Sequence, residues 1–253
     1  MSKTFRLSIP IFLVFFLLGL FSNPSFAKDA QEAKPEIRPA SLKKLSYSVA
    51  DPDQIAAAPG GLMLLRYIAA CALRPDQELT ATVEGKKYTF PGKLGLAPEW
   101  LGAPLSKSGQ RWVSACLMAH VNYFGVHVPI SVRAAHPNIQ ATYEPDELKN
   151  YPVREAAFYG NLFAPGEELA YVCRAYKNKE ESEYLKLRVC SEETDKPPFT
   201  RCEFVSTGVC DAVDPSQYEK ICQGGDGEQG YFKQCRGGGK QYEEVITVFV
   251  QKK

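Results

Sequence analysis

The sequence predicts an α+β protein in which two or three helices pack on a mostly antiparallel, disulfide-stabilised sheet. In the first half of the chain, apolar residues recur at the spacing of buried helix faces. The second half is mainly β, because runs of β-prone residues alternate there with turn residues. The chain also has 8 cysteines, an even number that predicts four disulfides in an exported protein.

The N-terminus has the pattern of a cleavable secretory signal. Lys3 and Arg6 precede an apolar run over 11–21, which is too short to span a bilayer. Small residues then precede an expected cleavage site between Ala27 and Lys28. No later stretch has the roughly 18 apolar residues of a membrane span, so we expect no membrane anchor after the signal is removed.

The domain organisation follows from this signal and from the change in composition along the chain. The segment after the signal is polar and contains prolines, which is typical of a flexible tail. We expect an exported protein that is periplasmic, at the cell surface or secreted. Its predicted parts are a signal peptide over 1–27, a flexible N-terminal tail over 28–40 and a single α+β domain over 41–253, with a helix-rich half over 41–150 and a cysteine-rich β half over 151–253.

Two helices and a hairpin are predicted in the helix-rich half. Residues 60–73 form one apolar face at helical spacing, and residues 78–90 are two β-prone runs around a Glu-Gly turn. The second helix is expected over about 109–124, with Gly125 ending it. Its apolar face contains Val113, Cys116, Leu117, His120, Val121 and Phe124.

The remaining elements are predicted to be strands. Residues 126–133 alternate apolar and polar, and a proline inside this run favours the edge of a sheet. The mostly apolar run at 244–250 suits the middle of a sheet. We expect an extended segment at 155–163 and a long hairpin that pairs 169–176 with 184–190.

The cysteines are expected to pair within the two halves of the chain. Cys71 and Cys116 lie on the apolar faces of two predicted helices, and packing of these helices would bring them to bridging distance. The other six allow 15 pairings. The expected set joins Cys173 to Cys190 across the long hairpin and places Cys210–Cys222 inside Cys202–Cys235. Zinc is the alternative, but no C-x2-C ligand pair is present, so we expect no metal and no cofactor.

Three histidines are the main candidates for catalysis. His120 falls on the buried helix face, whereas His127 falls on the polar side of the following strand and His136 in a loop. A metal site would require all three to converge, and no metal-binding or nucleophile motif is present. The alternative to a non-catalytic protein is a secreted hydrolase that uses His127 as a base with a nearby carboxylate such as Glu155.

The sequence therefore favours a non-catalytic binding or structural component of the cell envelope or secretome, with an unknown envelope or extracellular partner. Nucleic acid is not expected, because 30 Lys and Arg are balanced by 29 Asp and Glu. One group of aromatic residues could form a contact surface, although filling the core is the interpretation favoured by their size. These residues are Phe158, Tyr159, Phe163, Tyr171 and Tyr176.

Overall fold

The computed structural model describes residues 52–140, 144–164, 169–214, 219–226 and 229–252. The expected signal peptide and N-terminal tail lie outside these residues. Within the described part of the chain, no helix has both the length and the apolar character needed to cross a membrane.

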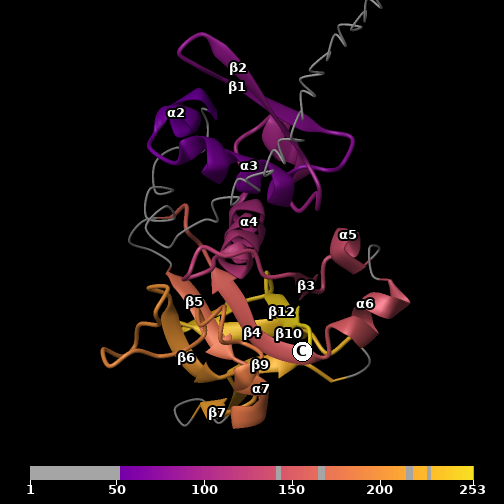
Figure 1. The fold of residues 1–253 in the computed structure, drawn as a ribbon, viewed down its shortest axis with the longest axis vertical. Coiled ribbons are helices and arrows are strands. Elements are labelled where there is room, and N and C mark those ends of the chain that lie inside the picture. Colours follow the sequence, from indigo (N-terminus) through magenta and orange to yellow (C-terminus); the bar gives the residue numbers. More distant parts are fainter. Residues whose placement is uncertain (1–51, 141–143, 165–168, 215–218, 227–228, 253) are drawn as a thin grey trace, which may run out of the picture. The chain divides into compact units, whose positions relative to one another are not determined.

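A five-stranded sheet forms the centre of the fold (Figure 1). Its strand order is β3-β12-β4-β5-β6, and every neighbouring pair is antiparallel except β5 and β6. As predicted, the strand that follows the second helix lies at an edge, and the apolar C-terminal strand lies in the interior of the sheet. The bounds are β3 (Ile130–Arg133), β4 (Val153–Gly160), β5 (Ala170–Arg174), β6 (Val205–Val209) and β12 (Ile246–Val250).

Helices cover one face of this sheet. Helix α4 (Lys107–His120) packs on β4 and β12, and α3 (Gly61–Ala72) packs on α4. A hairpin of β1 (Glu78–Val83) and β2 (Lys86–Pro91) follows α3, as predicted. The shorter helices are α2 (Pro52–Ala57), η1 (Pro98–Leu101), α5 (Pro137–Gln140), α6 (Pro145–Asn150) and α7 (Lys179–Glu183).

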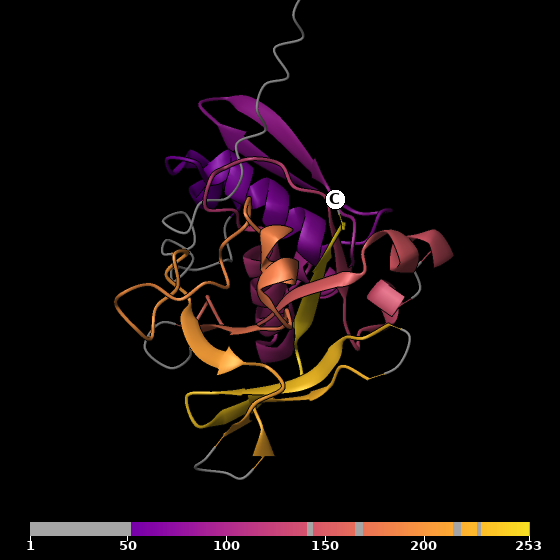
Figure 2. The ribbon, with the colours of Figure 1, turned by 60° about the horizontal axis from the view of Figure 1, so that its bottom comes forward.

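A three-stranded sheet of order β11-β10-β9 is the second part of the β half. Figure 2, in which the bottom of the molecule is turned forward, shows these strands in yellow. Its strands are β9 (Cys222–Gly224), β10 (Phe232–Gly237) and β11 (Lys240–Tyr242). A further short pair joins β7 (Val213–Asp214) to β8 (Glu219–Lys220).

Strand β4 separates two hydrophobic cores because successive side chains of a strand point to opposite faces. Ala156 and Phe158 lie in the core that contains α3 and α4. Ala157 and Tyr159 lie in a second core with residues of β9 and β10. Strand β4 is therefore buried on both faces. The combination of these helices and sheets confirms the α+β class predicted from the sequence.

Two predicted elements are wrong at their boundaries. The second helix ends at His120 instead of near residue 124, and the strand after it begins only at Ile130. The strand is short because β12 supplies backbone partners for Ile130–Arg133 only.

The long hairpin predicted for 169–176 and 184–190 does not form. Its expected turn contains α7, where the Asn178 side chain accepts a hydrogen bond from the Glu181 N–H. Residues 184–190 continue as turns, and β5 pairs with β6 instead.

The structure pairs Cys71 with Cys116 between α3 and α4, as expected from the packing of two helices. The other three expected pairings are wrong. The predicted hairpin that would have placed Cys173 opposite Cys190 does not form. Strand β5 pairs in parallel with β6 instead, and this pairing brings Cys173 next to Cys210, to which it is bonded.

The remaining bridges are local. Cys222 and Cys235 lie directly opposite each other on β9 and β10 and are bonded. Cys190 is bonded to Cys202 within one loop. The expected Cys202–Cys235 and Cys210–Cys222 bridges are therefore absent. Four disulfides indicate an oxidising environment outside the cytoplasm.

Candidate functional site

The candidate site is a groove of about 680 Å³ formed by two segments distant in sequence. One segment is the turn that follows α4, and the other is the loop closed by the Cys190–Cys202 bridge. We call it the aromatic groove. It is lined by Tyr123, Glu193, Thr194, Asp195, Lys196, Phe199, Thr200, Arg201 and Glu203.

Asn122 fixes the turn after α4. It is completely buried, its Oδ1 accepts a hydrogen bond from the Phe124 N–H at 2.8 Å, and its Nδ2 donates to the Leu187 carbonyl at 2.8 Å. A side chain that satisfies a backbone group two residues ahead favours a turn over helix. This explains why the helix ends before Tyr123 and why the following aromatic residues point outward.

The loop on the other side is anchored at its base. Arg188 donates from Nε to Glu155 Oε2 at 2.6 Å and from Nη2 to the Ala119 carbonyl at 2.7 Å. Both members of the ion pair are buried. Burial raises the pKa of the Glu155 carboxyl, and the nearby Arg188 guanidinium opposes this rise. The base of the loop is thereby attached to both β4 and the end of α4.

Backbone and side-chain hydrogen bonds hold the outer part of this loop. The Thr194 N–H and hydroxyl both donate to the Phe199 carbonyl, at 3.1 and 2.9 Å. The Ser206 hydroxyl donates to Glu193 Oε1 at 2.7 Å, which links the loop to β6. Together with the Cys190–Cys202 bridge, these bonds give the groove a preformed wall.

Large apolar side chains remain exposed at this site. Tyr123 is 46% exposed, Phe124 is 49% exposed and Phe199 is 48% exposed. The Tyr123 and Phe124 rings pack edge to face, with centroids 5.2 Å apart. The helical spacing had placed Phe124 in the core, so this expectation is wrong.

The aromatic residues proposed from the sequence as a contact surface lie mainly in the interior. Phe158, Tyr159 and Tyr171 are buried, and Phe163 and Tyr176 are partly buried. The aromatic groove consists of different residues, because it combines segments that only the tertiary structure brings together. The Asn-Tyr-Phe-Gly stretch at 122–125 is a possible sequence signal for it, since Asn and Gly both favour turns.

The structure does not assemble the hydrolase site considered from the sequence. His127 is exposed, whereas Glu155 is completely buried and paired with Arg188. Among the described residues, no carboxylate lies within ion-pair distance of His127. His136 packs against Trp112, with ring centroids 5.0 Å apart, and burial lowers its pKa.

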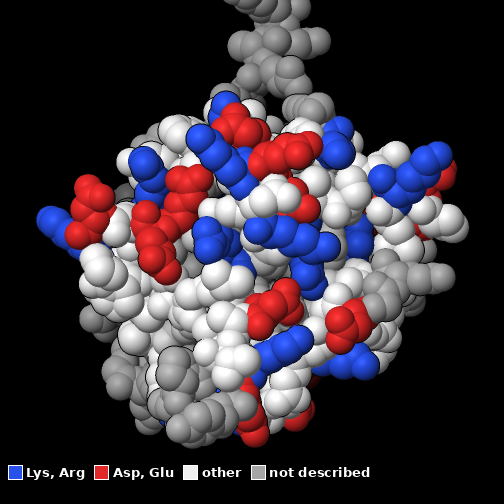
Figure 3. Space-filling view, turned by 90° about the horizontal axis from the view of Figure 1, so that it is seen from below, with Lys and Arg blue, Asp and Glu red and all other residues white. Residues whose placement is uncertain are grey.

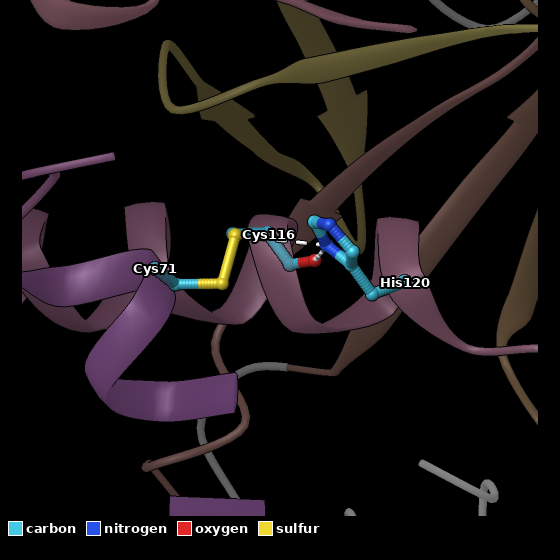
Figure 4. A group of neighbouring side chains, drawn as sticks. All are labelled: Cys71, Cys116 and His120. Atoms are coloured by element: carbon cyan, nitrogen blue, oxygen red, sulfur yellow. Dashed lines mark hydrogen bonds between the residues drawn. A yellow bond between two sulfur atoms is a disulfide. The ribbon is translucent and has the colours of Figure 1, made fainter. Parts of the chain in front are cut away.

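His120 lies one helical turn after Cys116, which is bonded to Cys71 (Figure 4). Its Nδ1 is 2.8 Å from the Cys116 carbonyl oxygen, so Nδ1 carries a proton and donates it. Burial lowers the pKa of His120, although the Cys116 carbonyl opposes this shift. Cys71 and Cys116 are joined in a disulfide, so they offer no thiolate to a metal. The cluster is a structural contact between two helices.

The charges seen from below the molecule are mixed. Figure 3 shows acidic and basic side chains interspersed over this face, without a continuous basic surface. Nucleic-acid binding requires clustered positive charge. This face therefore gives no support to a nucleic-acid partner.

Comparison with protein families, with characterised proteins and with solved structures finds no match to this chain.

Proposed function

We propose that this protein is an exported, non-catalytic binding protein whose aromatic groove takes an exposed segment of a protein partner. The observation that carries the proposal is that the half-exposed rings of Tyr123 and Phe199 line one preformed groove, with the exposed Phe124 ring packed beside Tyr123. Aromatic side chains are enriched at protein interfaces and contribute much of their binding energy.

The anchoring of the groove also supports binding. Ordering of loops at an interface opposes association, so a wall that is already fixed loses less entropy when a partner binds. The Cys190–Cys202 bridge, the buried Arg188 and the buried Asn122 fix the two walls before any ligand arrives. The volume of about 680 Å³ is also within the range of ligand-binding clefts.

The chemistry of the lining favours a peptide segment. Three acids, Glu193, Asp195 and Glu203, lie beside Lys196 and Arg201, so both signs of charge are present. Backbone amides and mixed charged side chains of a peptide can pair with such a lining, while the apolar side chains pack on the rings. A predicted secretory signal and four disulfides support a partner in the envelope or outside the cell.

Selection of short random peptides displayed on phage tests this proposal. The protein is immobilised with its disulfides intact, and selected peptides are measured against Tyr123→Ala/Phe199→Ala. We expect this double variant to lower the affinity by about tenfold or more, because truncation of central aromatic residues commonly has effects of this size.

The matched control removes exposed apolar side chains that do not line the groove. Leu169 is 52% exposed and Val213 is 55% exposed. Leu169→Ala/Val213→Ala should bind the selected peptides with the affinity of the wild type. The proposal would be contradicted if the groove variant bound the selected peptides as tightly as the wild type. It would also be contradicted if no displayed peptide were selected and an oligosaccharide library screened in parallel gave binders.

A further inference from the structure

Two of the four disulfides are in contact with each other in the core between the two larger sheets. Sγ of Cys173, bonded to Cys210, lies 3.2 Å from Sγ of Cys222, bonded to Cys235. This distance joins sulfurs of different bridges. The sulfur of Cys235 also lies within 4.8 Å of both Cys173 and Cys222. We call these four residues the four-cysteine cluster.

The contact is specific to this cluster. Among the described residues, neither Cys71–Cys116 nor Cys190–Cys202 has a sulfur of another bridge in such contact. The four-cysteine cluster is also buried, with no member more than 1% exposed. Burial hinders the access of dissolved thiols, so once one bridge has been opened, the disulfide nearest to the new thiolate belongs to the cluster itself.

We propose that the four-cysteine cluster is one thiol–disulfide exchange unit with two possible pairings. Exchange proceeds when a thiolate attacks a disulfide sulfur within reach. A Cys173 thiolate would attack Sγ of Cys222, which forms the Cys173–Cys222 bond and breaks the Cys222–Cys235 bond. Cys235 leaves as a thiolate and takes up the proton that Cys173 released. No net oxidation or reduction occurs in this step.

The two pairings attach the sheets differently. In the structure, Cys173–Cys210 links β5 to the end of β6, and Cys222–Cys235 links β9 to β10. Each bridge thus lies within one sheet. A Cys173–Cys222 bridge would instead crosslink the five-stranded sheet to the three-stranded sheet. In the wild type, a dithiol reductant that opens one bridge would supply the first thiolate, and the cluster would then act as a redox-sensitive switch.

The Cys210→Ser variant tests the proposal because it leaves a thiol at Cys173 beside the intact second bridge. The folded variant is incubated at mildly alkaline pH, where thiolate forms, then alkylated and digested with trypsin without reduction. We expect the peptides over 155–174 and 221–233 to be joined and Cys235 to be alkylated. Recovery of alkylated Cys173 with the Cys222–Cys235 bridge intact would overturn the proposal.

The reverse variant provides an independent test. Cys235→Ser leaves a thiol at Cys222, which should attack Cys173, so the same two peptides are joined and Cys210 is alkylated. The matched control, Cys202→Ser, leaves a thiol at Cys190 without a neighbouring bridge, and its other three bridges should stay as they are. If neither cluster variant folds, limited reduction of the wild type by dithiothreitol should yield the Cys173–Cys222 bond; its absence from the partly reduced species would refute exchange.

Discussion

Removing the guanidinium of Arg188 should strongly destabilise the protein. In Arg188→Met, the carboxylate of Glu155 stays completely buried and loses the donor at 2.6 Å, and the Ala119 carbonyl loses its donor at 2.7 Å. Breaking a buried ion pair on one side commonly lowers the free energy of unfolding by about 3–5 kcal/mol. For a chain of this size, this corresponds to a fall in melting temperature of roughly 6–20 °C.

Denaturant unfolding under non-reducing conditions measures this effect. Arg188→Met/Glu155→Leu removes both charges, so it should recover most of the loss, because no unpaired charge stays buried. Arg74→Met, which breaks the exposed contact with Asp76, is the control and should not shift the midpoint measurably. A single variant as stable as the wild type, or a double variant less stable than the single one, would refute the reasoning.

Three further predictions concern the turn, the pH dependence and processing. Asn122→Ala removes the hydrogen-bond partners of the Leu187 carbonyl and the Phe124 N–H. It should lower the free energy of unfolding by about 1–3 kcal/mol in denaturant titrations, and it should weaken binding of the selected peptides. The control variant Asn178→Ala, which removes the exposed cap of α7, should leave peptide binding unchanged. The pKa of His120 is lower in the folded protein than in the unfolded chain. As the pH falls below about 6.5, His120 therefore binds a proton more readily in the unfolded chain, and the free energy of unfolding should decrease from about pH 7 to about pH 5. His120→Gln should reduce this decrease when unfolding is measured across that range, and an unchanged slope would contradict the assignment. Mass spectrometry of the exported protein should find Lys28 at the N-terminus, and an intact 1–27 segment in the membrane fraction would exclude cleavage.

Elements whose causes are local were predictable from the sequence. The helix at Gly61–Ala72 has its own apolar periodicity, and the β1–β2 hairpin has Glu84 and Gly85 in the left-handed region at its turn. The position of β12 inside the sheet followed from its mostly apolar residues, four of the five in Ile246–Val250. The Cys71–Cys116 bridge followed from the apolar faces of two helices.

Elements that depend on distant partners were not predictable in this way. The end of α4 depends on Asn122, whose Nδ2 binds a carbonyl 65 residues away. Residues 184–190 have a β-prone composition, but they form turns instead of a strand. Arg188, one of these residues, donates hydrogen bonds to Glu155 and to the Ala119 carbonyl at the end of α4. The aromatic groove depends on both the turn fixed by Asn122 and the loop anchored by Arg188, so residue spacing along the chain could not identify it.

Hydrogen exchange with and without a selected peptide tests most directly whether the aromatic groove binds a partner segment. Bound peptide should slow amide exchange at 121–126 and 193–203, the two walls of the groove, because it excludes water from them. The β1–β2 hairpin, which does not line the groove, should exchange at the same rate in both states. Protection confined to other segments, or absent from both walls at saturating peptide, would contradict the proposed function.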